Sequence, residues 1–239
     1  MKRFRLALTL LLAFLTLVVL QAATVVSDSF TGLNNTNLTA RTGEVGATWA
    51  KQTGATGDLV ISTSNRARMG STMDSAEYYA SGTPVSADYS VQVDFYCVAG
   101  PVIASNFIWV KGRASTTSYD YYKITYDGNN QAWYLQKADD TVLGSSYSQV
   151  LTTGVTYVAK LVMTGTTIEM YIDGVQRTTA TDSTYTGTGK AGLGGFTEST
   201  NLDTEGIHWD NFIVTDSATA GGGINLRGFP GFIILPWRF

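Results

Sequence analysis

The body of this chain alternates between short strand-like runs and clusters of turn residues. Between residues 24 and 217, runs rich in Val, Ile, Thr, Tyr, Phe and Trp are separated by Gly, Asn, Asp and Ser. Turn signals recur roughly every eight to twelve residues, which is the spacing of an antiparallel β-sandwich. No stretch of this body has a sustained helical period, so the helical crossovers of a parallel sheet are not expected. The sequence therefore predicts one all-β domain over residues 24–217.

Four regions show the alternation most clearly, and two of them contain hairpin signals. They are 91–98, 106–111, the pair 121–126 and 131–136, and the pair 156–163 and 168–172. Asp127-Gly128-Asn129-Asn130 joins the first pair as a hairpin loop. Asp173-Gly174 follows the second pair and predicts a tight turn, because both central residues of such a turn need positive φ. The sheets are expected to be antiparallel.

The two ends differ from the body. Residues 1–23 have a basic start (Lys2, Arg3, Arg5), an apolar run and small residues after it, which is the layout of a signal peptide. The cleavage position is imperfect, so an uncleaved N-terminal anchor is the alternative. Either interpretation predicts a secreted, periplasmic or cell-surface protein.

Residues 218–239 begin with a Gly-rich linker and end in an apolar, aromatic tail. The tail, residues 224–239, contains two prolines and two glycines and is too short to span a bilayer. A tail this apolar is expected to dock against its own domain, another subunit, a membrane surface or an export apparatus, so a protein or membrane partner for residues 224–239 is a candidate.

Charge and cysteine content exclude some classes of function. The net charge is −3 and no basic stripe is present, so nucleic-acid binding is not expected. Cys97 is the only cysteine, which rules out an intrachain disulfide. It alternates with Val91, Val93 and Phe95 and is predicted to be a small buried residue.

The ordered motifs of the second half resemble the concanavalin A-like lectin/glucanase superfamily, on its laminin-G-like side. They are Tyr157–Leu161, Gly165–Val175 with its Asp-Gly turn, the glycine-rich Gly189–Gly195, and Trp209–Val214 with its Asp-Asn entry. Asp28-Ser29-Phe30, Trp49 and Tyr121–Ile124 extend the resemblance upstream. It implies a jelly-roll sandwich, and it specifies fold better than function.

A glucanase-type active site is not predicted. Catalytic relatives carry Glu-x-Asp-x-x-Glu on one strand, and neither Glu169 with Asp173 nor Asp203 with Glu205 reproduces it. The single histidine, His208, lacks the companions of a zinc site and is expected to be structural. We therefore assign no catalytic residue.

Aromatic and polar side chains are predicted to share one outward surface. If Ile108, Val110, Tyr122 and Ile124 face the core, their neighbours in sequence face outward. Aromatic rings that stack on sugars, beside polar groups that bind hydroxyls, are typical of carbohydrate sites. The candidate ligand-binding residues are Trp109, Lys111, Arg113, Tyr119, Tyr121 and Tyr134.

Calcium is a possible cofactor, because relatives bind it through Asp and Asn side chains. Asp28 near the first strand and Asp210 with Asn211 near the last would meet if the terminal strands pair. The sequence thus favours an exported, non-catalytic module that binds a glycan or polysaccharide. A structural or adhesion component of a virion or envelope is the alternative, and a divergent glycoside hydrolase is the third.

Overall fold

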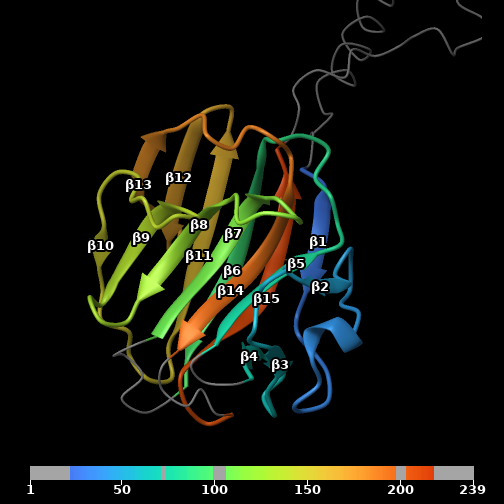
Figure 1. Cartoon of the computed structure of the whole chain (residues 1–239). Coiled ribbons are helices and arrows are strands. Elements are labelled where there is room, and N and C mark those ends of the chain that lie inside the picture. The colour runs from blue at the N-terminus through green and yellow to red at the C-terminus, as the bar shows by residue number, and fades with distance from the viewer. Residues whose placement is uncertain (1–21, 71–73, 99–105, 198–202, 218–239) are drawn as a thin grey trace, which may run out of the picture. The chain divides into compact units, whose positions relative to one another are not determined.

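The computed structural model describes residues 22–70, 74–98, 106–197 and 203–217. Residues 22–217 form one compact unit. Its described part consists of two antiparallel sheets packed face to face, with one short 3-10 helix at Leu38–Ala40 (Figure 1). The predicted all-β antiparallel sandwich is confirmed.

The first sheet has eight strands in the order β13-β12-β11-β6-β15-β4-β3, with β1 paired to β15. Its strands are β1 (Thr24–Asp28), β3 (Leu59–Ile61), β4 (Ala67–Met69), β6 (Tyr89–Cys97), β11 (Thr156–Thr164), β12 (Thr167–Ile172), β13 (Val175–Thr181) and β15 (Ile207–Asp216).

The second sheet has seven strands in the order β10-β9-β8-β7-β14-β5-β2. Its strands are β2 (Trp49–Lys51), β5 (Ser75–Ala80), β7 (Asn106–Ala114), β8 (Tyr122–Asp127), β9 (Ala132–Lys137), β10 (Tyr147–Ser148) and β14 (Lys190–Thr197). In Figure 1, β14 (orange) lies between β7 (green) and β5, although about eighty residues separate β14 from β7 in the chain.

The core lies between the sheets and follows the period-two pattern of the strands. Every second residue of β6, from Tyr89 to Cys97, is buried. From the facing sheet, Trp133 packs edge-on against Phe95 with 5.1 Å between ring centroids. Cys97 is buried as predicted. Burial of apolar side chains, these large rings among them, is the dominant favourable contribution to folding.

Both predicted hairpins are present. β8 pairs with β9, and β11 pairs with β12. Asp173 and Gly174 turn the chain from β12 into β13 with φ values of 53° and 75°, so both adopt the predicted positive φ. The predicted meeting of the terminal strands also occurs, since β1 lies along β15.

One detail of the last strand differs from the prediction. Asp210-Asn211 is not the entry to this strand, because β15 already begins at Ile207. Instead, the pair forms a bulge inside the strand, with Asn211 at φ 49°, and shifts the register against β6. Asn tolerates this left-handed conformation better than most residues.

The predicted N-terminal signal and the C-terminal tail lie almost wholly outside the described residues. Only Ala22 and Ala23 of the first and none of the second are described. No helix in the described part of the chain is long and apolar enough to cross a membrane.

Candidate functional site

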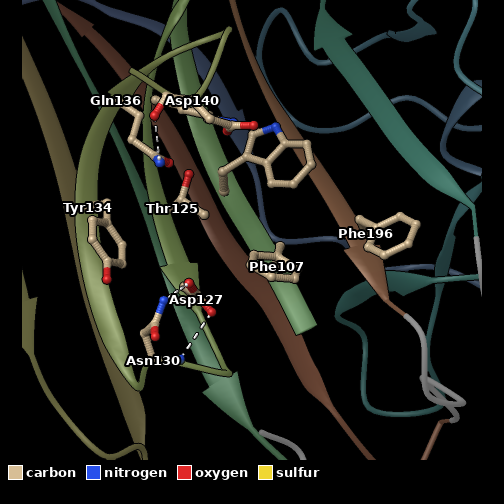
Figure 2. Close-up of a pocket in the computed structure, with 10 residues that line it drawn as sticks. Phe107, Thr125, Asp127, Asn130, Tyr134, Gln136, Asp140 and Phe196 are labelled. Carbon is tan, nitrogen blue, oxygen red and sulfur yellow. Dashed lines mark hydrogen bonds and ion pairs between the residues drawn. The ribbon is translucent and has the colours of Figure 1, made fainter. Parts of the chain in front are cut away.

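A hollow of roughly 480 Å³ lies on the face of the seven-stranded sheet that is turned away from the core (Figure 2). It is built on β7, β8, β9 and the end of β14. Its lining residues are Phe107, Trp109, Lys123, Thr125, Asp127, Asn130, Tyr134, Gln136, Asp140 and Phe196. Four of these are aromatic, and the other six all carry a hydrogen-bonding group. Below, "the hollow" means this set.

Strand register arranges the lining side chains in rows. In one row, Trp109 lies opposite Thr125, and Thr125 lies opposite Tyr134. In the next row, Phe107 lies between Phe196 on β14 and Asp127 on β8. Side chains directly opposite each other on neighbouring strands have Cβ atoms about 4.5–5.5 Å apart. Aromatic groups therefore flank a polar middle strand, β8.

Three buried polar atoms of side chains that line the hollow have no hydrogen-bond partner in the described part of the chain. They are Trp109 Nε1, Thr125 Oγ1 and Gln136 Oε1. Trp109 is 6% exposed and Thr125 is 4% exposed. Leaving such a group unsatisfied costs about 1–3 kcal/mol. The first atom is a donor, the second donates or accepts, and the third accepts.

Lys123 lies beside Trp109 and carries the positive charge of the hollow. Its Nζ is 4.7 Å from the Trp109 ring centroid, within cation–π range. The same Nζ donates to Asp140 Oδ1 at 2.7 Å. The Lys123 side chain is 5% exposed, whereas that of Asp140 is 75% exposed. The carboxylate thus reaches the buried ammonium from the solvent side.

The Asp127 carboxylate is held by the β8–β9 turn, as Figure 2 shows. Its Oδ1 accepts from the backbone N–H groups of Asn129 and Asn130, and its Oδ2 accepts from Asn130 Nδ2 at 2.6 Å. Asp127 therefore keeps the turn rigid at one end of the hollow. The negative charge of Asp127 lies at that end of the hollow.

Two predicted ligand-binding residues, Trp109 and Tyr134, line the hollow. Lys111 and Tyr121 lie on the same face but are covered. Lys111 is 0% exposed and forms an ion pair with Glu77, while the Tyr121 hydroxyl donates to Glu77 Oε1 at 2.5 Å. Burial lowers the pKa of Lys111, and the Glu77 carboxylate opposes that shift.

The segment 115–121 explains why this half of the face is closed. Tyr121 lies over the Lys111 ammonium, 4.8 Å from ring centroid to Nζ. Gln52 Nε2 donates to the Ser118 carbonyl at 3.4 Å and links the segment to the region after β2. Tyr119, which is 45% exposed, belongs to this segment and does not line the hollow.

The prediction that Arg113 faces outward beside Trp109 is wrong. Arg113 has φ 50°, and the register of β7 against β14 shifts next to it, which redirects the side chain. Its guanidinium donates to the carbonyls of Ala87, Tyr185 and Gly165 at 2.9–3.0 Å. Arg113 ties loops together at one end of the sandwich.

The three predicted calcium ligands have other partners. Asp28 is buried. Its Oδ2 accepts from Arg41 Nη1 at 2.5 Å and from Trp49 Nε1 at 2.6 Å. Its Oδ1 accepts from the Phe30 N–H at 2.7 Å. Asn211 Nδ2 donates to Asp94 at 2.8 Å.

Asp210 lies 3.6 Å from Arg66 Nε. Within the described ranges, no three His, Cys, Asp or Glu side chains gather as they would around a metal ion. A calcium site at these residues stays a prediction.

The residues weighed for catalysis also have structural contacts. His208 is buried, with Nε2 3.2 Å from the Glu205 carbonyl oxygen. Glu169 accepts from Gln176 Nε2 at 2.9 Å, Asp173 accepts from the Val158 N–H at 2.8 Å, and Asp203 accepts from the Thr63 N–H at 2.7 Å. None of these residues lines the hollow.

Lys123 lies between the predicted core residues Tyr122 and Ile124, so the alternation places it on the outward face, but sequence reasoning missed most of the remaining lining. Phe107 and Thr125 follow from the same alternation that placed Trp109, so their signal was present. Phe196 depends on β14 pairing with β7, a contact between distant segments that no local pattern reports. Asn130, Gln136 and Asp140 belong to turns and strand ends near β9.

No protein-family model and no curated protein matches this sequence. Solved structures do match its fold. The carbohydrate-binding module CBM66 from Bacillus subtilis is 16% identical, with a TM-score of 0.51 over 70% of this chain and 91% of that one.

A protein of unknown function with a galectin-like fold from Bacillus subtilis is 14% identical, with a TM-score of 0.57 over 81% and 96%. A β-glucanase from Bacillus licheniformis is 12% identical, with a TM-score of 0.54 over 82% and 100%. These likenesses show the fold alone, a jelly-roll sandwich of the concanavalin A-like kind, as predicted. The laminin-G-like attribution stays a prediction.

Proposed function

We propose that this protein is an exported, non-catalytic carbohydrate-binding module and that the hollow is its glycan site. The observation that carries the proposal is the group of unpartnered polar atoms among aromatic rings: Trp109 Nε1, Thr125 Oγ1 and Gln136 Oε1. A sugar hydroxyl both donates and accepts, so it is chemically suited to each of these groups. The fold neighbours include a carbohydrate-binding module, which agrees with this function.

Aromatic surface supports the same ligand class. Phe107 and Phe196 lie side by side on β7 and β14, and Tyr134 lies across the hollow on β9. Pyranose rings have apolar C–H faces that pack on aromatic side chains while their edges form hydrogen bonds. This combination fits a sugar better than it fits a fully apolar ligand, because six of the ten lining residues carry polar groups whose hydrogen bonds an apolar ligand cannot replace.

A hydrolase is the weaker interpretation, although a β-glucanase shares the fold. Among the residues that line the hollow, the carboxylates are Asp127 and Asp140. Asp127 is engaged by three N–H donors of its turn, and Asp140 is paired with Lys123. A glycosidase needs one carboxylate as acid and another as base or nucleophile beside the scissile bond. We therefore assign binding and no catalysis.

The test is a glycan-array screen of the purified full-length protein, repeated with Trp109→Ala. A set of related glycans that the wild type binds, and Trp109→Ala does not, would support the proposal. Tyr119→Ala is the matched control, because Tyr119 is an exposed aromatic residue outside the hollow. Tyr119→Ala should bind as the wild type does.

Two outcomes count against the proposal. A blank array for the wild type, with and without calcium, would contradict glycan binding. Loss of binding in Tyr119→Ala but not in Trp109→Ala would move the site away from the hollow. In the first case, the structural or adhesion alternative would be tested next, through a protein or membrane partner for residues 224–239.

A further inference from the structure

We infer that the hollow is selective for neutral glycans over acidic ones, and that Asp140 is the residue that sets this selectivity. The inference rests on the proposed function of the hollow. The charge balance of the hollow is set by its own side chains, and neither the fold nor the solved structures that share it determine that balance.

The charged groups of the hollow nearly cancel. Lys123 supplies one positive charge, and Asp127 and Asp140 supply two negative ones. Asp140 is bonded to the Lys123 ammonium at 2.7 Å, so the only cation that lines the hollow is already neutralised. Once Lys123 and Asp140 are paired, the remaining charge of the lining is the negative charge of Asp127. An acidic sugar would meet this carboxylate without a free cation to offset the repulsion.

The position of Asp140 makes it a stand-in for a ligand carboxylate. Its side chain is 75% exposed, yet it reaches Lys123, whose side chain is 5% exposed. A uronate or a similar acid entering from solvent would have to take the same place on the ammonium. Asp140 is tethered to the chain, so its effective concentration at Lys123 is far above that of a free ligand.

The local backbone holds Asp140 in this role. Asp140 has φ 63° in the turn after β9, a left-handed conformation that Asp and Asn tolerate. Its backbone N–H donates to the Lys137 carbonyl at 3.0 Å, and its own carbonyl accepts from Gln136 Nε2 at 3.3 Å. The turn therefore presents the carboxylate toward Lys123 and also orients Gln136, another residue of the hollow.

Asp139 offers a matched control one residue away. It carries the same charge in the same turn, but its carboxylate accepts from the Thr141 N–H at 3.1 Å and does not contact Lys123. Asp140→Asn and Asp139→Asn remove the same charge, keep nearly the same volume and preserve turn-compatible residues. Only the first leaves the Lys123 ammonium without a carboxylate partner.

The experiment compares each full-length variant on paired polysaccharides. The probes are a glucan, a galactan and a mannan, each as the neutral parent and with its primary hydroxyls oxidised to carboxylates. The wild type should bind at least one parent, and the oxidised form about tenfold more weakly or worse. Asp140→Asn should tighten binding of the oxidised form by on the order of tenfold, about the contribution of one charge-assisted hydrogen bond. Asp139→Asn should retain the wild-type ratio.

A double variant checks that the effect acts through Lys123. Lys123→Gln combined with Asp140→Asn should return the preference for the neutral parent, because no cation is left to receive an acid. Equal wild-type affinity for parent and oxidised forms would overturn this inference while leaving glycan binding intact. An equal gain in affinity for the oxidised form in Asp139→Asn and Asp140→Asn would also overturn it. Binding to no parent and no oxidised form would overturn the proposed function, and the inference with it.

Discussion

The indole of Trp109 lies directly over Gly194 of the neighbouring strand. The two residues are register partners in the pairing of β7 with β14. A Cβ atom placed on Gly194 would overlap Trp109 Nε1 and the adjacent ring atoms. The bare backbone of Gly194 is therefore what allows the largest aromatic side chain of the hollow to lie close to the sheet.

Gly194→Ala is predicted to destabilise the protein and displace the Trp109 ring. Overpacking of this kind costs about 1–3 kcal/mol, and glycan affinity should fall because the ring loses its position. Denaturant unfolding and tryptophan fluorescence measure both effects. Gly187→Ala is the control, because a Cβ at Gly187 has nothing within 4 Å. Gly187→Ala should change the free energy of unfolding by less than about 0.5 kcal/mol. Equal losses of stability and affinity in the Gly187 and Gly194 variants would contradict this role of Gly194.

Thr125→Val is predicted to change stability and binding in opposite directions. The Thr125 hydroxyl is buried without a hydrogen-bond partner among the described residues, so replacing it with a methyl group removes a penalty of about 1–3 kcal/mol. Glycan affinity should nevertheless fall by about two- to tenfold, because the side chain can rotate its hydroxyl toward a bound sugar and one hydrogen bond to the ligand contributes about 0.5–1.5 kcal/mol. Thermal unfolding and titration with an array hit test the two effects.

Thr178→Val is the matched control for that prediction. The Thr178 hydroxyl accepts from the Ser145 N–H at 3.1 Å and lies outside the hollow. This variant should lose stability and retain binding, the reverse of Thr125→Val. If Thr125→Val destabilises the protein and leaves affinity unchanged, the hydroxyl is structural and does not contact the ligand.

Local alternation was sufficient to predict most of the fold. Trp109 and Thr125 were recoverable as outward residues because their neighbours Val110 and Ile124 are plainly core residues. The Asp173-Gly174 turn followed from the steric demand for positive φ. In each case the information lies within a few residues of the position it determines.

Which residues line the hollow was harder to predict from the sequence, for three physical reasons. Phe196 joins Phe107 through a strand pairing between distant segments, which depends on the global topology. Arg113 leaves the predicted face because of a bulge, and a single residue at φ 50° reverses the side-chain alternation. Lys111 kept its face, but segment 115–121 covers it, and coverage by a loop has no periodic signal.

The contacts of Asp28 predict, against the calcium site expected from the sequence, that removal of calcium leaves stability unchanged. The Asp28 oxygens are engaged by Arg41, Trp49 and Phe30, so calcium would have to displace an arginine to bind there. The melting temperature should be the same in excess EDTA and in excess calcium. A clear increase with calcium would instead support the predicted site, and its loss in Asp210→Asn would assign it.

Stability is predicted to fall at high pH because buried tyrosines resist ionisation. Burial is the main cause that raises the pKa values of Tyr78, Tyr122 and Tyr126 to about 12, from an ordinary value of 10.0. The folded state therefore retains protons that the unfolded state releases. This stability is fully present below about pH 10 and is lost as pH rises through 12. Denaturant unfolding across this range should show the fall, and Tyr126→Phe should reduce its slope; a constant free energy up to pH 12 would contradict the prediction.

Breaking the buried ion pair between Lys111 and Glu77 is predicted to cost more than replacing it. Lys111→Met alone leaves the Glu77 carboxylate buried with only the Tyr121 hydroxyl, and a lone buried charge costs about 3–5 kcal/mol. Lys111→Met with Glu77→Leu removes both charges and should recover most of that loss, because the face is covered. A double-mutant cycle in denaturant unfolding measures the coupling. If the double variant is as unstable as the sum of the single ones, the pair contributes through packing and its charges are not coupled.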